Sequence, residues 1–227
     1  MKNDVKEAFV TSIPVMMGYI VLGMAFGMLL QSKGYPILYA LLMSVFIYAG
    51  SMQFVAIDLL TGGATLINAA MMTLLINARH MVYGLSMLKK FENMGKYKPY
   101  MIFSLTDETY SLLVKDNHYQ GTNEKRYLFF ISFFNQCYWI FGSLIGALLG
   151  EMLTINTTGL DFAMTALFVV IVTEQMLYND KHIYNYIGFI ISIVSLLIFG
   201  SEAFIIPAMI GIVLSLFALY KRGHHYA

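Results

Sequence analysis

The sequence predicts an all-α, polytopic membrane protein built as a bundle of helices. Its 227 residues are 59% hydrophobic and 12% charged, whereas an ordinary soluble domain carries about 25% charged residues. Apolar runs long enough to cross a lipid bilayer, which takes about 20 helical residues, recur along the whole chain. A net charge of +1 indicates no binding to nucleic acid. We therefore expect one transmembrane domain, residues 1–227, embedded in a lipid bilayer.

Six segments have the length and composition of full membrane crossings. Each is predominantly apolar and about 17 to 23 residues long, which as a helix approaches the thickness of the hydrocarbon core. These predicted spans are residues 12–31, 66–88, 127–149, 162–178, 183–200 and 204–220. The glycines of the first span are expected to form a close-packing surface for another helix. They are Gly18, Gly23 and Gly27.

Two further segments do not fit a single crossing. Pro36–Thr61 is about 26 residues long, or about 39 Å as a helix, and has "YAGSMQF" at its centre. Two shorter half-helices that meet at Gly50–Ser51 are therefore expected. Pro99–Val114 covers only about 24 Å as a helix and contains the acidic pair Asp107 and Glu108. It is too short and too charged for an ordinary span, so we expect a second broken or re-entrant element.

Lysines and arginines indicate how these two segments are threaded, because short loops rich in them stay in the cytoplasm. The loop after residue 88 holds four lysines, at positions 89, 90, 96 and 98. It would lie outside if both broken segments were full spans, whereas every basic loop lies inside if both return to their own side. We therefore expect six full spans plus two broken elements in the cell (inner) membrane, with both termini cytoplasmic. Eight full spans is the alternative.

The predicted breaks point to transport rather than catalysis. Non-helical backbone survives at membrane depth only when it is buried in protein or lines a cavity, and transporters often bind substrate where helices unwind. The sequence has no HExxH, CxxC, Walker A or GxSxG pattern. Its single cysteine, Cys137, allows no internal disulfide and offers no metal-binding set. We expect a transporter that is not an enzyme and that needs no cofactor or metal.

The motif "NARH", residues 77–80, places an arginine inside a predicted span. Arg79 lies roughly 13 Å of helix away from the lysines that mark the interface. An unpaired charge at that depth costs at least about 2.5–3.5 kcal/mol, so an anion should meet it. Asp107, Glu108 and Asp58 are the candidates within the chain. One hypothesis is a permanent internal ion pair; the other is that the planar guanidinium binds a substrate carboxylate during part of the transport cycle.

Asn77 and His80 flank this arginine. They lie about 60° apart on a helix, whereas Arg79 points roughly 100–160° away from them. Polar groups thus face several sides, which places this turn inside the bundle and makes Asn77 a candidate substrate ligand. His80 titrates in the physiological range and could relay a proton. Alternatively, it is a neutral histidine that bonds a backbone carbonyl.

The motif "TDE" suggests a helix start that also carries chemistry. Thr106 is expected to cap a helix whose first turn holds Asp107 and Glu108. Adjacent carboxylates repel each other in a low dielectric, so one of them should take up a proton readily, as a coupling site requires. The pair could also receive a substrate ammonium. We assign Asp107 and Glu108, together with His80, to proton coupling or ammonium binding.

Polar residues also follow the expected break in the earlier segment. Ser51 and Gln53 could donate or accept hydrogen bonds from a substrate, with Phe54 as an apolar wall. The alternative is that these polar side chains only join neighbouring helices. With Arg79 and Asn77, they complete the predicted substrate-binding set.

Five stretches together resemble the AzlC family, the large subunits of bacterial branched-chain amino-acid exporters. They are "GMAFG", "FIYAGSMQFVAIDLL", "LLINARHMVYGLSM", "SLTDETYSLL" and "GLDFAMTALFVVIV". The resemblance covers nearly the whole chain, and the NARH and TDE motifs are its most specific parts. It implies a plasma-membrane exporter of branched-chain amino acids and close analogues. It also implies a partner, a small hydrophobic membrane subunit of the AzlD type.

An amino-acid substrate suits the predicted site. Its carboxylate matches Arg79, its ammonium matches Asp107 or Glu108, and a branched side chain fits among apolar residues. We therefore expect the large subunit of a two-component secondary transporter that exports branched-chain amino acids and is coupled to protons. The alternatives are export of another small zwitterion, or a structural subunit whose polar groups hold the small partner.

Overall fold

The computed structural model describes residues 2–114, 119, 123–152 and 182–223, together with isolated positions between 153 and 181. The described residues form helices and contain no strand, which confirms the all-α class for this part of the chain. The chain divides into two compact units, Met1–Met164 and Thr165–Ala227. Each unit is described by itself, and a single domain over residues 1–227 stays a prediction.

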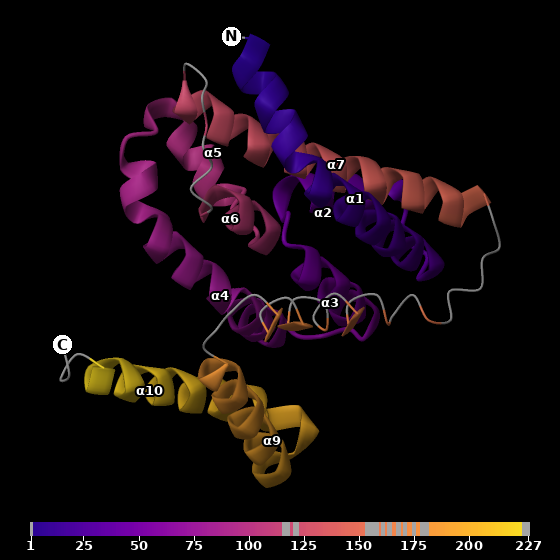
Figure 1. Cartoon of the computed structure of the whole chain (residues 1–227). Helices are drawn as coiled ribbons and strands as arrows, with labels where there is room; N and C mark the ends of the chain where they lie inside the picture. The colour runs from indigo at the N-terminus through magenta and orange to yellow at the C-terminus, as the bar shows by residue number, and fades with distance from the viewer. Residues whose placement is uncertain are drawn as a thin grey trace. The chain divides into compact units, whose positions relative to one another are not determined.

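Figure 1 shows the helices in chain order. The first unit contains α1 (Lys2–Ser32), α2 (Ile37–Phe46), α3 (Gly50–Thr61), α4 (Leu66–Glu92), the short 3-10 helix η1 (Gly95–Tyr97), α5 (Lys98–Phe103), α6 (Asp107–Val114) and α7 (Glu124–Met152). The second unit contains α9 (Ile183–Ala203) and α10 (Ile205–Gly223).

Helices α1 and α7 lie side by side (Figure 1), and they pack backbone against backbone through glycines. A Cβ atom added to Gly27 would lie 2.1 Å from the carbonyl oxygen of Ser143. One added to Gly146 would lie 2.1 Å from the carbonyl oxygen of Met24. Such distances are possible only without side chains, the arrangement that small residues four apart allow between membrane helices. This helix pair is the scaffold on which the rest of the first unit is built.

The register of this contact shows that α1 and α7 run in the same direction. Gly23 lies against the α7 backbone between Trp139 and Ser143, and Gly27 lies one turn further along, between Ser143 and Ala147. The predicted packing surface is therefore confirmed at Gly23 and Gly27. It is wrong at Gly18, where an added Cβ would meet nothing within 4 Å.

Helix α2 runs antiparallel to α7. Its start follows the C-terminal end of α1, where the side chain of Gln31 lies beside Gly150 near the C-terminal end of α7. Its end lies nearer the N-terminal end of α7, because the Gln136 amide donates to the carbonyl oxygen of Val45 at 3.1 Å. The segment thus enters the helix pair from the C-terminal end of α7 and stops about halfway.

The chain then turns and α3 runs back toward the end from which α2 came. Tyr48, with φ of 43°, adopts the left-handed conformation that ends α2. Gly50 begins α3 against the ring of Trp139, and Phe54 packs edge-on against Phe26 of α1, with ring centroids 5.8 Å apart. The predicted break in this segment is confirmed. It falls at residues 47–49, just before the predicted Gly50–Ser51, because Tyr48 rather than the glycine leaves the helical conformation.

Helix α4 connects α3 to η1 and α5. Helix α5 then packs along α7, starting from the N-terminal end of α7. The ring of Tyr97, just before α5, packs on Phe129 near the start of α7, with centroids 4.7 Å apart. Further along, Tyr100 donates to the side chain of Gln136 at 2.6 Å. Helix α5 therefore runs along α7 from the N-terminal end of α7 toward its middle, and α5 ends at the interruption formed by residues 104–106.

From this interruption, helix α6 runs back toward the N-terminal end of α7. Asn135 donates to Thr109 in the first part of α6 at 3.0 Å. Beyond the helix, the ring of Tyr119 stacks on Tyr127, with centroids 4.5 Å apart. Because the contacts move from residue 135 back to residue 127, α5 and α6 form a second hairpin. The predicted break in Pro99–Val114 is confirmed.

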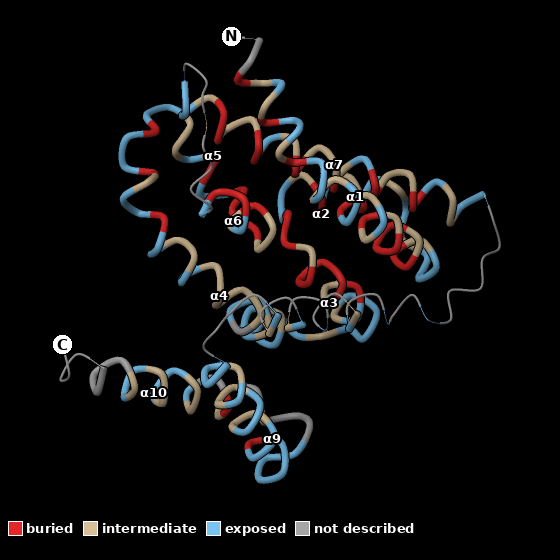
Figure 2. Tube along the Cα trace, in the orientation of Figure 1, coloured by how far each residue is buried: buried red, intermediate tan, exposed pale blue. Residues whose placement is uncertain are grey.

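Buried side chains of the first unit gather where the hairpins meet the helix pair. Figure 2 shows them as red segments on α1, α3, α6 and α7. They form two apolar clusters, one around Phe26, Ile57 and Trp139 and one around Met101 and Leu113. One cluster surrounds the hairpin of α2 and α3, and the other surrounds the hairpin of α5 and α6.

Three of the described helices are long and apolar enough to cross a membrane, judged by length and composition. They are Asp4–Ser32, Glu124–Met152 and Ile183–Gly200. Helix α4 has the length of the predicted span 66–88 but includes the polar NARH motif. The predicted span 204–220 corresponds to α10, whose apolar stretch Ile210–Leu219 is shorter. The predicted span 162–178 lies largely outside the described residues.

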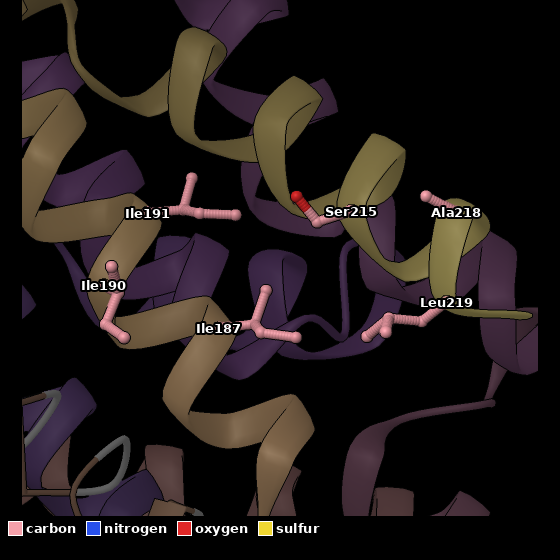
Figure 3. A pocket seen from close by; sticks show the side chains of 6 residues that line it. All are labelled: Ile187, Ile190, Ile191, Ser215, Ala218 and Leu219. Atoms are coloured by element: carbon pink, nitrogen blue, oxygen red, sulfur yellow. The ribbon is translucent and has the colours of Figure 1, made fainter. Parts of the chain in front are cut away.

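In the second unit, α9 bends at Gly200, which has φ of 73°, and α10 follows. A shallow hollow of about 460 Å³ lies between these two helices (Figure 3). Its walls are apolar apart from one serine hydroxyl, and they consist of Ile187, Ile190, Ile191, Ser215, Ala218 and Leu219. None of the predicted site residues belongs to this hollow, so the site lies in the first unit.

Candidate functional site

The two hairpin tips meet halfway along the α1–α7 pair. The ring of Tyr48, at the tip between α2 and α3, lies 6.4 Å from that of Phe103, at the tip between α5 and α6. The ring of Tyr19 on α1 lies edge-on to both Tyr48 and Trp139, at 6.5 and 5.4 Å. Both helix interruptions, and the backbone groups that they free from helical bonding, are thus brought to one place.

Arg79 links the two hairpins at this level. Its Nη1 lies 2.5 Å from Oδ2 of Asp107, the first residue of α6. Its Nη2 donates to the hydroxyl of Ser51, the second residue of α3, at 2.5 Å. The anion that the sequence requires for Arg79 is therefore Asp107 among the three candidates. The ion pair is partly accessible, with 25% of the arginine side chain and 15% of the aspartate side chain exposed.

Positive potential converges on this cluster from three sources. Ser51 and Asp107 belong to the first turns of α3 and α6, and helix N-termini carry a partial positive charge. The guanidinium of Arg79 adds a full charge. An anion placed between them meets both hydrogen-bond donors and favourable potential. In the structure, the carboxylate of Asp107 lies beside the guanidinium of Arg79.

Glu108 points to a different neighbour from Asp107. It accepts a hydrogen bond from the hydroxyl of Tyr19 on α1 at 2.7 Å. The same hydroxyl is hydrogen bonded to Oγ1 of Thr106 at 2.6 Å. The two adjacent acids therefore have separate partners: Asp107 pairs with Arg79 of α4, and Glu108 bonds Tyr19 of α1. Their separation follows from the roughly 100° between successive residues on a helix.

The start of α6 is fixed by further polar contacts. The backbone N–H of Thr109 donates to Oγ1 of Thr106 at 3.3 Å, so the predicted N-cap is confirmed. The buried amide of Asn135 donates to Oγ1 of Thr109 at 3.0 Å. This ties the tip of the second hairpin to α7. Tyr19 and Asn135 were not predicted from the sequence; the polar pair Asn135 and Gln136 within an apolar span was the available signal.

Gln53 and Phe54 hold the first hairpin in place. Gln53 is fully buried, accepts a hydrogen bond from Nε1 of Trp139 at 2.9 Å, and donates to Ser44 at 3.4 Å. Phe54 is buried against Phe26. Gln53 thus makes the interhelical polar contact that was the alternative to substrate binding. Its role, and that of Phe54, toward a substrate stays a prediction.

Asn77 and His80 lie on α4 beside the cluster rather than in its hydrogen bonds. The buried side-chain oxygen of Asn77 has no hydrogen-bond partner within the described part of the chain. His80 contacts Tyr83 edge-on, with centroids 6.0 Å apart, and Tyr83 stacks on Tyr110 of α6 at 4.5 Å. Through these rings, His80 is connected to the second hairpin. Proton relay by His80 stays a prediction.

Among the described residues, no group of three or more His, Cys, Asp or Glu side chains could hold a metal ion. Asp58, the third candidate partner of Arg79, is exposed near the end of α3. Among the described residues, the side chains that meet at the hairpin tips include one guanidinium, two carboxylates and neutral hydroxyl and amide groups. Groups of this kind can pair with the charges of a small molecule.

Comparison with known proteins identifies the family of this chain. The family described as AzlC protein matches residues 14–153. The chain is 42% identical over 216 residues to the branched-chain amino acid transport protein AzlC of Bacillus subtilis, covering 95% of this chain and 85% of that protein. It is 44% identical over 217 residues to a membrane protein of Helicobacter pylori, covering 96% and 95%.

A more distant relative is the inner membrane protein YgaZ of Escherichia coli, 32% identical over 168 residues, or 70% of this chain and 67% of that protein. No solved structure matches the chain. The matched region contains both hairpins, Arg79 and the TDE motif, and the relatives are membrane proteins. The chain belongs to the AzlC family.

Proposed function

We propose that this chain is the large subunit of a two-component secondary transporter that exports branched-chain amino acids across the plasma membrane. Membership of the AzlC family and similarity to a branched-chain amino acid transport protein support transport of this substrate class. The observation that carries the mechanism is the partly accessible ion pair of Arg79 and Asp107 between two helix hairpins. The partner is a small hydrophobic subunit of the AzlD type.

Substrate recognition starts from the two charges of an amino acid. Arg79 binds the carboxylate, because its planar guanidinium presents two parallel N–H donors to two oxygens. Ser51, already hydrogen bonded to Arg79, adds a hydroxyl on the same side. Glu108 or Asp107 receives the ammonium. Neither charge of the substrate is then left unpaired at membrane depth, where the cost would be several kcal/mol.

Apolar walls select for the side chain without polar recognition. Aromatic rings surround the hairpin tips, including those of Tyr48 and Phe103. Such walls distinguish valine, leucine and isoleucine only weakly, since one methylene is worth about 1–3 kcal/mol. Overlapping specificity for the branched-chain amino acids follows. Proton coupling would pass through Glu108, Asp107 or His80.

The contacts of the first unit support two re-entrant hairpins rather than two further full spans, and we propose six full spans for the whole chain. Helices α2 and α6 have 10 and 8 residues, or about 15 and 12 Å, well short of a hydrocarbon core of about 30 Å. Each hairpin also returns to the end from which it came. In this arrangement the four lysines after residue 88 lie at the cytoplasmic end, as does the N-terminus of α1. With six full spans, we propose the same side for the C-terminus.

Cysteine labelling tests this topology. In a Cys137→Ala background, a cysteine at Asn93 should react with a membrane-impermeant maleimide only after permeabilisation. A cysteine at the exposed Lys33, between α1 and α2, is the matched control and should react in intact cells. Labelling of position 93 from outside would favour eight full spans.

A leucine efflux assay tests the function. Arg79→Lys keeps the charge but loses the planar donor pair, so leucine and valine export from loaded cells should fall sharply. Arg126→Lys, at the start of α7, is the matched control and should export normally. The small subunit should still co-purify with both variants. If Arg79→Lys loses co-purification together with export, the chain acts as an assembly subunit instead.

A further inference from the structure

The ion pair of Arg79 suggests a role for Asp107 that differs from that of its neighbour Glu108. We propose that Asp107 is a tethered competitor of the substrate: its carboxylate occupies, in the empty transporter, the position on Arg79 that the amino-acid carboxylate takes. The inference rests on the proposed function and adds an exchange step to it. Binding replaces one carboxylate by another, and Glu108 is left to receive the ammonium.

The geometry at the guanidinium leaves room for a better ligand. Arg79 bonds Oδ2 of Asp107 through Nη1, while its Nη2 is directed to the neutral hydroxyl of Ser51. A free carboxylate can instead bond both terminal nitrogens, which is the strongest arrangement for this pair of groups. A substrate therefore gains more from Arg79 than Asp107 does. Partial exposure of both side chains gives a small molecule access to them.

The backbone of Asp107 does not have to move for the exchange. Thr106 caps α6 and is tied to Tyr19, and Asn135 holds Thr109. At the other end of α6, Lys90 donates to the carbonyl oxygen of Leu113 at 2.5 Å. With the helix fixed at both ends, rotation of one aspartate side chain suffices to free Arg79.

The net charge of the cluster is the same before and after exchange, but exchange decides which carboxylate is left without a cation. Arg79, Asp107 and Glu108 carry one positive and two negative charges when ionised, and the zwitterion adds one of each. If Asp107 remained on Arg79, the substrate carboxylate would lie beside two like charges without a cation. After exchange, Arg79 holds the carboxylate, Glu108 holds the ammonium, and Asp107 turns toward the partly exposed side of the cluster.

The exchange can be measured with a probe that has the carboxylate but no ammonium. Four-methylpentanoate, which is leucine without its amino group, is titrated into the purified chain, together with its small partner where that co-purifies, by isothermal calorimetry. Asp107→Asn removes the competitor, so the probe should bind about five- to tenfold more tightly than to wild type. Leucine export by the same variant should fall, because release of the carboxylate is no longer assisted.

Glu108→Gln is the matched control, since it removes the same charge one residue away. It should change the affinity for the probe by less than about twofold. Equal gains in affinity for the probe in the two variants would mean that only the overall charge matters, and they would overturn the inference. No gain in affinity in Asp107→Asn would overturn it as well. The Arg79→Gln variant distinguishes failure of the exchange inference from failure of the proposed function. If it binds leucine as wild type does, the proposed function fails as well.

Discussion

The two helix hairpins of the first unit differ in the chemistry of the contacts at their tips. The hairpin of α2 and α3 is fixed by neutral groups, with Gln53 bonded to Trp139 and Gly50 against the same ring. The hairpin of α5 and α6 has neutral contacts as well, such as that of Asn135 with Thr109, but its tip also carries charge, with Asp107 on Arg79 and Glu108 on Tyr19. Ser51 is the point where the neutral hairpin also contacts the arginine.

Under the proposed function, this difference predicts which hairpin responds to substrate. Neutral hydrogen bonds and ring contacts do not depend on pH or on added ions, so the first hairpin serves as a fixed wall. Ionic contacts can be replaced by a substrate carboxylate, an ammonium or a proton, so the second hairpin can exchange partners without unfolding. Variants on each hairpin and on their common support should therefore fail in different ways.

The largest effect is expected where both hairpins share a support. Gly146→Leu would place a side chain on the backbone of Met24, to which even a Cβ lies 2.1 Å away. The α1–α7 pair should not form, and detergent extraction followed by size exclusion should yield no monodisperse protein. Gly18→Leu is the matched control. It has open space around it and should behave as wild type.

The next largest effect is expected at Glu108, in the hairpin of α5 and α6. Glu108→Gln keeps the hydrogen-bonding shape but cannot carry a charge, so the dependence of leucine export on an imposed pH gradient should be lost. Glu124→Gln, at the exposed start of α7, serves as control and should retain the dependence. Export by Glu108→Gln that still follows the gradient would exclude this acid from coupling.

A smaller effect, on stability alone, is expected in the neutral hairpin. Gln53→Leu leaves the buried indole N–H of Trp139 without its acceptor, which costs about 1–3 kcal/mol. The thermal unfolding midpoint should fall while the pH dependence of export stays unchanged. Adding Trp139→Phe removes the unsatisfied donor and should recover part of the loss. A changed pH profile in Gln53→Leu would erase the distinction between the hairpins.

The smallest effect tests how the charged hairpin is anchored at its far end. Lys90→Gln removes a cation from the C-terminal carbonyls of α6, an interaction of about 0.3–1 kcal/mol. The unfolding midpoint should fall slightly, and the affinity for leucine should stay the same. Lys89→Gln changes the same charge on the exposed neighbouring residue and should not alter the midpoint. Equal shifts in both variants would mean that the lysine acts only through overall charge.

Pattern and length predicted much of this architecture. The excess length of residues 36–61, and the acidic pair within residues 99–114, predicted both interruptions, because a helix rises by a fixed amount per residue. The depth of Arg79 predicted an anion beside it. Tyr19 gave no signal, since an aromatic residue in an apolar span is typical of core packing. Asn135 was overlooked although polar residues within a span commonly mark contacts between helices.

The sequence by itself determined the membrane class, the two helix interruptions and the need of one deep guanidinium for a negative partner. These follow from hydropathy, helix length and the cost of a charge in hydrocarbon, which are local properties of the chain. Only the tertiary structure decided that the partner is Asp107 and that Glu108 turns to Tyr19. Adjacent residues face different sides of a helix, so the orientation of α6 against α1, α4 and α7 selects which acid meets the arginine.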